Sequence, residues 1–295
     1  MLRKLIKIIQ KSALPEIQLR NRERENFEFL KTHTSPITFI CSYPRSGNTW
    51  LRHLMADCLL QKAGCECAAG LPIHPDKLIP DIHCHQLDEI SCHTTKNIFC
   101  KSHFSPLQIS NFLGESVDQR INFIYLYRNP DDALISFFYF KLRYPETSNV
   151  AEIGSDKFCK DELSNWIEHI DQTLQHMKNR KNVCLIKYED LHQYTSGIIH
   201  EIWKWLQIDI PNEACFHAVN HMQFTKLQNM EKQSNSNTSG HLFFRKGQIG
   251  DAANELKHTT IEQIYHRTAD VLRRANSRCL KAEFFIASRT EMGKH

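Results

Sequence analysis

Short apolar runs alternate along this chain with stretches of helical spacing. The apolar runs are rich in β-branched residues and predict four strands, at 37–41, 97–101, 121–126 and 182–187. Helical spacing predicts helices over 49–61, from Pro130 onward, and around 198–206. Strands separated by helices are typical of βαβ units. The pattern therefore predicts an α/β fold with a mainly parallel central sheet flanked by helices.

No internal repeat and no linker divides the 295 residues, so we expect a single large domain. We place this domain at 35–280, followed by a C-terminal tail at 281–295. Within the domain, residues 62–96 show little periodicity. The polar residues 228–250 predict a mobile surface loop.

The N-terminal segment 1–34 has a different character. Residues 2–11 place apolar side chains on one helical face with basic side chains around it, which predicts a basic amphipathic helix. Such a helix can make peripheral contact with an anionic membrane or pack on its own domain. Residues 17–34 are polar and charged, and predict a lead-in to the first strand.

The composition is that of an ordinary globular protein, with 41% hydrophobic and 24% charged residues. The formal net charge of +4 is not concentrated in one block, which argues against nucleic-acid binding. No window reaches the roughly 18 apolar residues of a membrane helix, and no secretory signal is recognisable. We therefore expect a cytoplasmic protein whose eleven cysteines are reduced. The sequon at 237–239 is then not expected to carry a glycan.

The turn after the first strand has the composition of an anion site. It contains Gly47 and leads into the helix predicted at 49–61, whose N-terminus offers backbone N–H groups and a positive dipole end. Its side chains add further donors: Arg45, Ser46, Asn48 and Thr49. A plain capped turn is the alternative interpretation. The turn lacks the G-x-x-x-x-G-K-[ST] spacing, which argues against an ATP or GTP hydrolase.

The other three predicted strands also end in polar or cationic residues. These are Lys101 and His103 after the second strand, Arg128 and Ser136 after the third, and Tyr188 after the fourth. Ligands of open α/β sheets bind beyond the carboxyl ends of the strands, so we expect these side chains at one site. A late segment, Arg245 to Gly247, follows the predicted mobile loop and suits a segment that folds over a bound anion.

In these motifs and their order the chain resembles the family of PAPS-dependent sulfotransferases, which have a P-loop-kinase-like nucleotide-binding core. The resemblance covers about residues 36–250, and the Arg-Ser-Gly-Asn-Thr form of the turn is closer to bacterial or saccharide-type members. It implies transfer of a sulfuryl group from 3′-phosphoadenylyl sulfate (PAPS) to a hydroxyl or amine. The acceptor would be a small molecule, a lipid or a saccharide, and no metal would be required.

The resemblance also implies a role for each motif residue. His103 would be the general base, while Lys101 and Arg45 would stabilise the oxygens around the transferred group. Trp50 and Phe224 would stack on opposite sides of the adenine base. The residues expected to bind the donor are Arg45, Ser46, Gly47, Asn48, Thr49, Trp50, Arg128, Ser136, Tyr188, Phe224, Arg245, Lys246 and Gly247.

Three departures and three alternatives accompany this interpretation. Arg45 stands where cytosolic animal members usually carry Lys, an aromatic run expected after Gly250 and Asp251 is missing, and the usual C-terminal dimerisation motif is missing. The oligomeric state is therefore not predicted. The alternatives are a nucleotide kinase, a nucleotide-binding protein without catalysis, and a zinc module built from the Cys- and His-rich segment 58–103.

Overall fold

The computed structural model describes five stretches of the chain: residues 20–64, 75–87, 96–144, 149–233 and 244–280. The amphipathic helix expected at 2–11 and the tail expected at 281–295 lie outside the described residues. None of the described helices combines the length and apolarity needed to cross a membrane.

A four-stranded sheet forms the centre of the protein, and all neighbouring strands in it are parallel. The strands are β1 (Ile37–Cys41), β2 (Ile98–Ser102), β3 (Ile121–Tyr127) and β4 (Val183–Lys187), in the spatial order β2-β1-β3-β4. This confirms the predicted α/β fold, with each strand boundary within one residue of its expected position. Because the strands are parallel, their carboxyl ends meet at one edge of the sheet.

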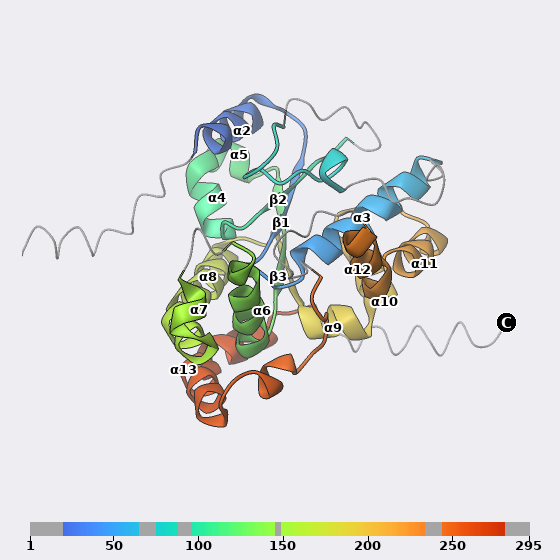
Figure 1. The fold of residues 1–295 in the computed structure, drawn as a ribbon. Helices are drawn as coiled ribbons and strands as arrows, with labels where there is room; N and C mark the ends of the chain where they lie inside the picture. Colours follow the sequence, from blue (N-terminus) through green and yellow to red (C-terminus); the bar gives the residue numbers. More distant parts are fainter. Residues whose placement is uncertain (1–19, 65–74, 88–95, 145–148, 234–243, 281–295) are drawn as a thin grey trace, which may run out of the picture.

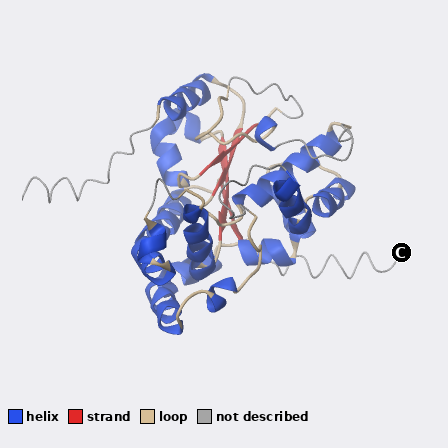
Figure 2. Cartoon of the chain, in the orientation of Figure 1, coloured by secondary structure: helices blue, strands red, loops and turns tan. Residues whose placement is uncertain are grey.

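Helices cover both faces of the sheet (Figures 1 and 2). One face carries α2 (Asn21–Thr32), α4 (Pro106–Leu113), α5 (Glu115–Asp118), α6 (Pro130–Leu142), α7 (Val150–Ile153), α8 (Ser155–Asn179) and α13 (His258–Asn276). The other face carries α3 (Asn48–Lys62), α9 (Tyr188–Gln193), α10 (Thr195–Trp205), α11 (Asn212–His221) and α12 (Phe224–Gln233). Two short 3₁₀ helices complete the described elements, η2 (Pro75–Lys77) and η4 (Asp251–Asn254).

The central strand β1 is buried along its whole length, as expected for a parallel strand covered on both faces. Successive side chains point to opposite faces, so Phe39 packs into the core under α6 and α8, while Ile40 packs into the core under α3 and α10. These two cores fix the sheet between its helical layers, and they hold the strand ends in place.

Two expectations about irregular segments were wrong. Residues 17–34 are not a plain polar lead-in, because α2 forms within them and buries Phe27 and Leu30 in the core. The loop expected at 228–250 does not begin at 228, because α12 continues to Gln233, and residues 234–243 lie outside the described residues. Both helices carry few apolar residues, so their sequences reveal no clear helical periodicity.

Candidate active site

Hydrogen bonds within the turn between β1 and α3 fix its shape. The buried Asn48 amide donates to the Ile40 carbonyl at 3.1 Å and to Ser42 Oγ at 3.2 Å. Its side-chain donors are thus used inside the turn, so we expect Asn48 to meet an anion with its backbone N–H. The Ser46 hydroxyl is fully buried and lacks a hydrogen-bond partner among the described residues. An anion oxygen would satisfy that hydroxyl.

Two residues of this turn have left-handed backbone conformations. Gly47 has a φ of 98°, and a Cβ at this position would lie only 2.5 Å from Cδ2 of Tyr188, so only glycine fits. Arg45 has a φ of 67°, which is uncommon for a non-glycine residue and is typical of functional turns. Its Nε donates to Ser136 Oγ at 3.3 Å, and its guanidinium lies 5.1 Å from the centre of the Phe140 ring. The turn thus directs Arg45 toward α6.

A cluster of positive charge surrounds Arg45. The side chain lies in the electric field of three further arginines: Arg128, Arg143 and Arg245. Burial, and then the repulsion from these three charges, lowers the pKa of Arg45 to about 9. Arg143 also pairs with Glu231 at 2.7 Å. An anion bound among these arginines would relieve the repulsion.

Arg128, just beyond β3, is buried and connects three segments. Its Nη2 donates to the Gln248 carbonyl at 2.7 Å and lies 3.4 Å from Oδ2 of Asp132. Its guanidinium lies 4.7 Å from the centre of the Tyr188 ring. Its Nε is buried and has no hydrogen-bond partner among the described residues. Arg128 therefore retains a donor that could bind a phosphate oxygen.

The late segment containing Gly247 returns to the same edge of the sheet. Gly247 has a φ of 64°, and a Cβ there would lie 2.6 Å from the Phe224 ring. The Tyr188 hydroxyl donates to the Gly247 carbonyl at 3.4 Å. The segment thus packs on the start of α12 and on α9, which brings the predicted residues Tyr188, Phe224 and Gly247 together.

The two cations of this segment contact carboxylates of their own segment. Arg245 pairs with Asp251, and its guanidinium lies 4.3 Å from the centre of the Tyr139 ring. Nζ of Lys246 lies 2.7 Å from Asp251 and 2.9 Å from Glu255. These ion pairs hold both cations near the arginine cluster, and a bound phosphate would compete with the carboxylates for them.

Aromatic side chains form one wall of the site. The rings of Trp50 and Tyr188 are 6.1 Å apart, and His192 lies 6.1 Å from each of them. The Trp50 indole donates to the Met222 carbonyl at 3.0 Å, which ties it to the segment just before Phe224. The arrangement provides planar surfaces of the kind that stack on a nucleotide base.

His103 follows β2 and lies beside the turn. Its Nδ1 is 3.0 Å from the Ser42 carbonyl oxygen, which can only accept a hydrogen bond. Nδ1 must therefore carry the proton, and Nε2 presents a lone pair. Burial, reinforced by the charge of Lys101, holds the pKa of His103 well below its usual value. The imidazole is consequently neutral at pH 7 and can accept a proton.

Lys101 is buried and forms an ion pair with Asp81. Burial alone would raise the pKa of Asp81, but the attraction of Lys101 outweighs it and holds the pKa at about 2. The carboxylate therefore stays ionised, and Lys101 stays paired with it. Asp81 could not be identified from the sequence, because it lies in the segment 62–96, where no periodicity gives it a structural context.

One alternative found in the sequence is a zinc module, and its segment overlaps the site at Lys101 and His103. Of the Cys- and His-rich segment 58–103, residues 65–74 and 88–95 lie outside the described residues, and within the described part no group of three or more potential ligands is arranged around a metal position.

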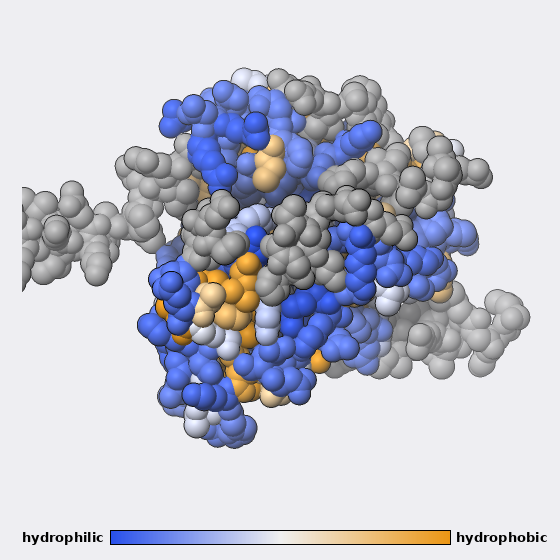
Figure 3. All heavy atoms as spheres, in the orientation of Figure 1, coloured by the Kyte–Doolittle hydropathy of each residue, from blue (hydrophilic) through white to orange (hydrophobic). Residues whose placement is uncertain are grey.

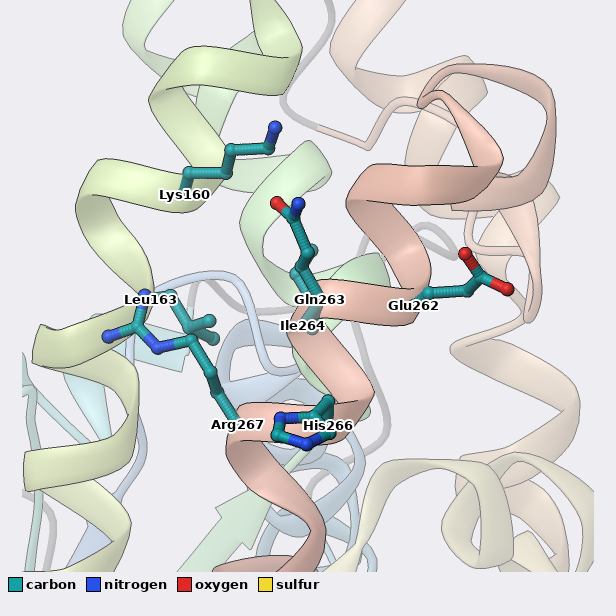
Figure 4. Close-up of a pocket in the computed structure, with 7 residues that line it drawn as sticks. All are labelled: Lys160, Leu163, Glu262, Gln263, Ile264, His266 and Arg267. Atoms are coloured by element: carbon teal, nitrogen blue, oxygen red, sulfur yellow. The ribbon is translucent and has the colours of Figure 1, made fainter.

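A cavity of about 350 Å³ lies between α8 and α13 (Figure 4). None of the predicted site residues lines it, so it is separate from the edge of the sheet described above.

The fold and this site define a class of protein: an α/β protein in which a glycine-containing turn, a histidine and several arginines meet at the carboxyl ends of parallel strands, where open α/β sheets bind their ligands. The sequence model of the sulfotransferase domain matches residues 35–275, which is most of the chain. The chain therefore belongs to the family of PAPS-dependent sulfotransferases.

Curated relatives carry the same family name. The chain is 27% identical over 259 residues to human sulfotransferase 2B1, and the match covers 76% of this chain and 62% of the human protein. The chain thus spans a little under two thirds of that relative. It is 25% identical over 237 residues to cytosolic sulfotransferase 7 of Arabidopsis thaliana, covering 74% of this chain and 73% of the plant protein.

Solved structures share the fold. Retinol dehydratase in complex with retinol and PAP superposes with a TM-score of 0.61 at 19% identity, covering 85% of each chain. Mouse sulfotransferase SULT7A1 complexed with PAP gives a TM-score of 0.57 at 22% identity, covering 86% of this chain and 93% of the mouse chain. These similarities show that the overall fold is shared.

Proposed function

We propose that this protein transfers the sulfuryl group of PAPS to a hydroxyl or amine of a small-molecule acceptor. The observation that carries the proposal is the state of His103. Its Nδ1 proton is held by the Ser42 carbonyl, so its Nε2 is a base next to a turn built for an anion. Membership of the sulfotransferase family supports the proposal.

The donor nucleotide carries a 5′-phosphosulfate and a 3′-phosphate, and the site offers groups for both. The buried Ser46 hydroxyl and the N-terminus of α3, with Thr49 in its first turn, would bind the 5′-phosphate. The buried Nε of Arg128 would bind the 3′-phosphate. The other groups proposed for the 3′-phosphate are Ser136, Arg245 and Lys246. Trp50 and Phe224 would enclose the adenine base.

In the proposed reaction, Nε2 of His103 takes the acceptor's proton as the acceptor oxygen or nitrogen attacks sulfur. The new bond to sulfur forms as the bond between sulfur and the bridging oxygen breaks. The bonding electrons leave with the 5′-phosphate. Lys101 and Arg45 would stabilise the negative charge on these oxygens. Arg45 contacts α6 in this structure, so we expect it to act from the side of Ser136.

The aromatic residues of α6 suggest the acceptor class. Phe138 is buried in the core, but Phe137 and Phe140 are half-buried with ring centres 6.3 Å apart, and Tyr144, two residues beyond α6, is 48% exposed. Figure 3 shows apolar surface gathered over α6 and α7. Relatives include a 3-beta-hydroxysteroid sulfotransferase and an amine sulfotransferase. We propose an apolar alcohol, phenol or amine, with lipid and saccharide acceptors as the alternatives to be screened.

His103→Ala tests the proposed function. We expect acceptor-dependent release of PAP to fall by about 100-fold or more, in the range typical of a lost general base, while the Kd for PAP stays within about twofold. His258→Ala is the matched control, since that imidazole is 86% exposed at the start of α13. Turnover by His103→Ala at the wild-type rate would refute the assignment of the base.

We further propose that the protein works in the cytoplasm. Eight of its cysteines lie in the described residues, and all eight are free thiols. Six of these eight are buried. Thiols in this state suit a reducing compartment.

Peripheral membrane contact through residues 2–11 stays a prediction, and selective binding of the full chain to anionic vesicles would test it.

A further inference from the structure

Residues 80–83, which we call the strap, run parallel to the end of β2. Two backbone hydrogen bonds of 2.8 and 3.1 Å join the strap to Lys101, and a parallel β-bridge pairs Asp81 with Lys101. Two residues further along both segments, the same register places His83 beside His103. The strap thus sets an acidic side chain against one proposed catalytic residue and an imidazole against the other.

The hydrogen bonds of His83 determine where its proton lies. Its Nε2 is 3.0 Å from the backbone nitrogen of His103, which can only donate, so Nε2 must hold a lone pair. The proton is therefore on Nδ1, which donates to Oε1 of Glu23 at 2.6 Å. Ser102 Oγ accepts a hydrogen bond from the N–H of Phe104 at 2.9 Å. Its hydroxyl lies 3.2 Å from Nε2 of His83, to which it can donate a second, shared hydrogen bond. All these contacts agree on one tautomer.

Helix α2 supports the strap from behind. Glu23 is only 4% exposed, so its carboxylate is fixed close to His83. One turn along α2, the Asn26 amide donates to the carbonyls of Ile82 and His85 at 2.9 and 2.8 Å. The orientation of His83 is therefore set by two side chains of a helix that the sequence did not predict.

The position of β2 explains why this support is needed. β2 lies at an edge of the described sheet, so backbone N–H groups on its outer side have no strand to bond. The strap supplies a partner for Lys101, and His83 supplies one for His103. Nε2 of His169 lies 2.9 Å from the carbonyl oxygen of His103, and the Ser42 carbonyl holds its ring. Contacts to its backbone N–H, its carbonyl oxygen and its ring thus fix His103.

We infer that His83, oriented by Glu23, is a positioning residue for His103. The inference rests on the proposed function, since it assumes that His103 is the base. The rings of His83 and His103 are nearly parallel, at 14°, with centres 6.2 Å apart. His83 acts through the backbone of its neighbour: it fixes the N–H of His103 and so the direction in which Nε2 points at the acceptor.

Three variants separate positioning from folding. His83→Ala removes the acceptor for the His103 N–H, and we expect kcat to fall about 10- to 100-fold, with KM for the acceptor and Kd for PAP within about twofold of wild type. His83→Gln can place an amide oxygen near the lost Nε2, and we expect it to restore kcat to within about threefold. His85→Ala is the matched control: this imidazole follows the strap, but its Nδ1 lies 3.5 Å from Asp76 rather than against His103, so kcat should be unchanged.

A spectroscopic measurement tests the same geometry without catalysis. In protein labelled with ¹⁵N-histidine, long-range ¹H–¹⁵N correlations should show both His83 and His103 with the proton on Nδ1. A proton on Nε2 of His83 would overturn the inference. So would His83→Ala with wild-type kcat, or equal loss of kcat in His83→Ala and His85→Ala. A wild-type protein that binds PAP but shows no transfer would instead refute the proposed function.

Discussion

The close packing of Gly47 on Tyr188 makes Gly47→Ala the most revealing single substitution. The added methyl group meets two obstacles. The backbone φ of 98° is left-handed, and the Cβ would lie 2.5 Å from one carbon of the Tyr188 ring and 2.7 Å from another. The second obstacle forces either the ring or the turn to move by roughly 1 Å, since ordinary carbon contacts lie near 3.5 Å or beyond.

The two costs can be separated. A left-handed alanine costs about 1–2 kcal/mol, and an overpacked methyl group costs about 1–3 kcal/mol more. Gly250 has a similar conformation, with φ 79° and ψ 14°, but a Cβ there meets nothing within 4 Å. Gly250→Ala should therefore lower the free energy of unfolding only by the backbone cost, about 1–2 kcal/mol. Gly47→Ala should lower it by both costs, about 2–5 kcal/mol in total.

Urea unfolding measures these losses, and calorimetric titration with PAP measures the effect on the site. Because Tyr188 also contacts Trp50 and Arg128, its displacement should weaken PAP binding about 10-fold or more in Gly47→Ala. If Gly47→Ala and Gly250→Ala lose equal stability, and PAP binding is unchanged in Gly47→Ala, then the packing of the turn on Tyr188 does not shape the donor site.

Three further predictions follow from the charges of the site. Arg128→Ala should weaken PAP binding about 10- to 100-fold, as expected for a lost charged hydrogen bond. Adenosine 5′-phosphate has no 3′-phosphate, so its binding should change by less than about threefold. Equal losses of affinity for both ligands in calorimetry would contradict a role for Arg128 at the 3′-phosphate. Because the pKa of His103 is lowered, its neutral form persists as pH falls, so kcat should stay level from pH 8 to about 6.5 and decline only below that; a decline centred above pH 7 would contradict the assignment. The pKa of Asp81 is lowered to about 2 in the folded protein, from 3.8 in the unfolded chain. The ion pair with Lys101 therefore stabilises the fold fully above pH 3.8, and this stabilisation is lost as the pH falls through about 2. The stability advantage over Asp81→Asn, about 2 kcal/mol in urea unfolding at pH 7, should therefore shrink between pH 4 and 2, and a gap independent of pH would exclude the ion pair as its source.

The sequence predicted the sheet well because its signals are local. Each strand is a short apolar run, and each ends in polar residues, so the parallel arrangement that brings Arg45, His103, Arg128 and Tyr188 to one edge could be inferred from four separate patterns. The fold of this edge needed no long-range information beyond the rule that parallel strands share their carboxyl ends.

The partners of these residues could not be predicted in the same way. Asp81 pairs with Lys101, and Glu23 pairs with His83, across 20 and 60 positions of sequence. Neither acid lies in a periodic or motif-like segment, and only the docking of α2 and the strap brings them to the site. The side-chain amide of Asn48 donates within its own turn, and this could not be foreseen, because whether an amide bonds a ligand or its own turn depends on backbone geometry that residue identity does not reveal.

The most direct test of the central claim is transfer itself. Purified full-length protein is incubated with ³⁵S-labelled PAPS and a panel of phenols, sterols, other lipid alcohols, amines and saccharides, and the products are identified by mass. We predict that label moves to at least one small-molecule acceptor with matching release of PAP, and that His103→Ala releases PAP at least about 100-fold more slowly while its Kd for PAP stays within about twofold of wild type. Transfer that continues at the wild-type rate in His103→Ala, or a wild-type protein that binds PAP but labels no acceptor class, would contradict it.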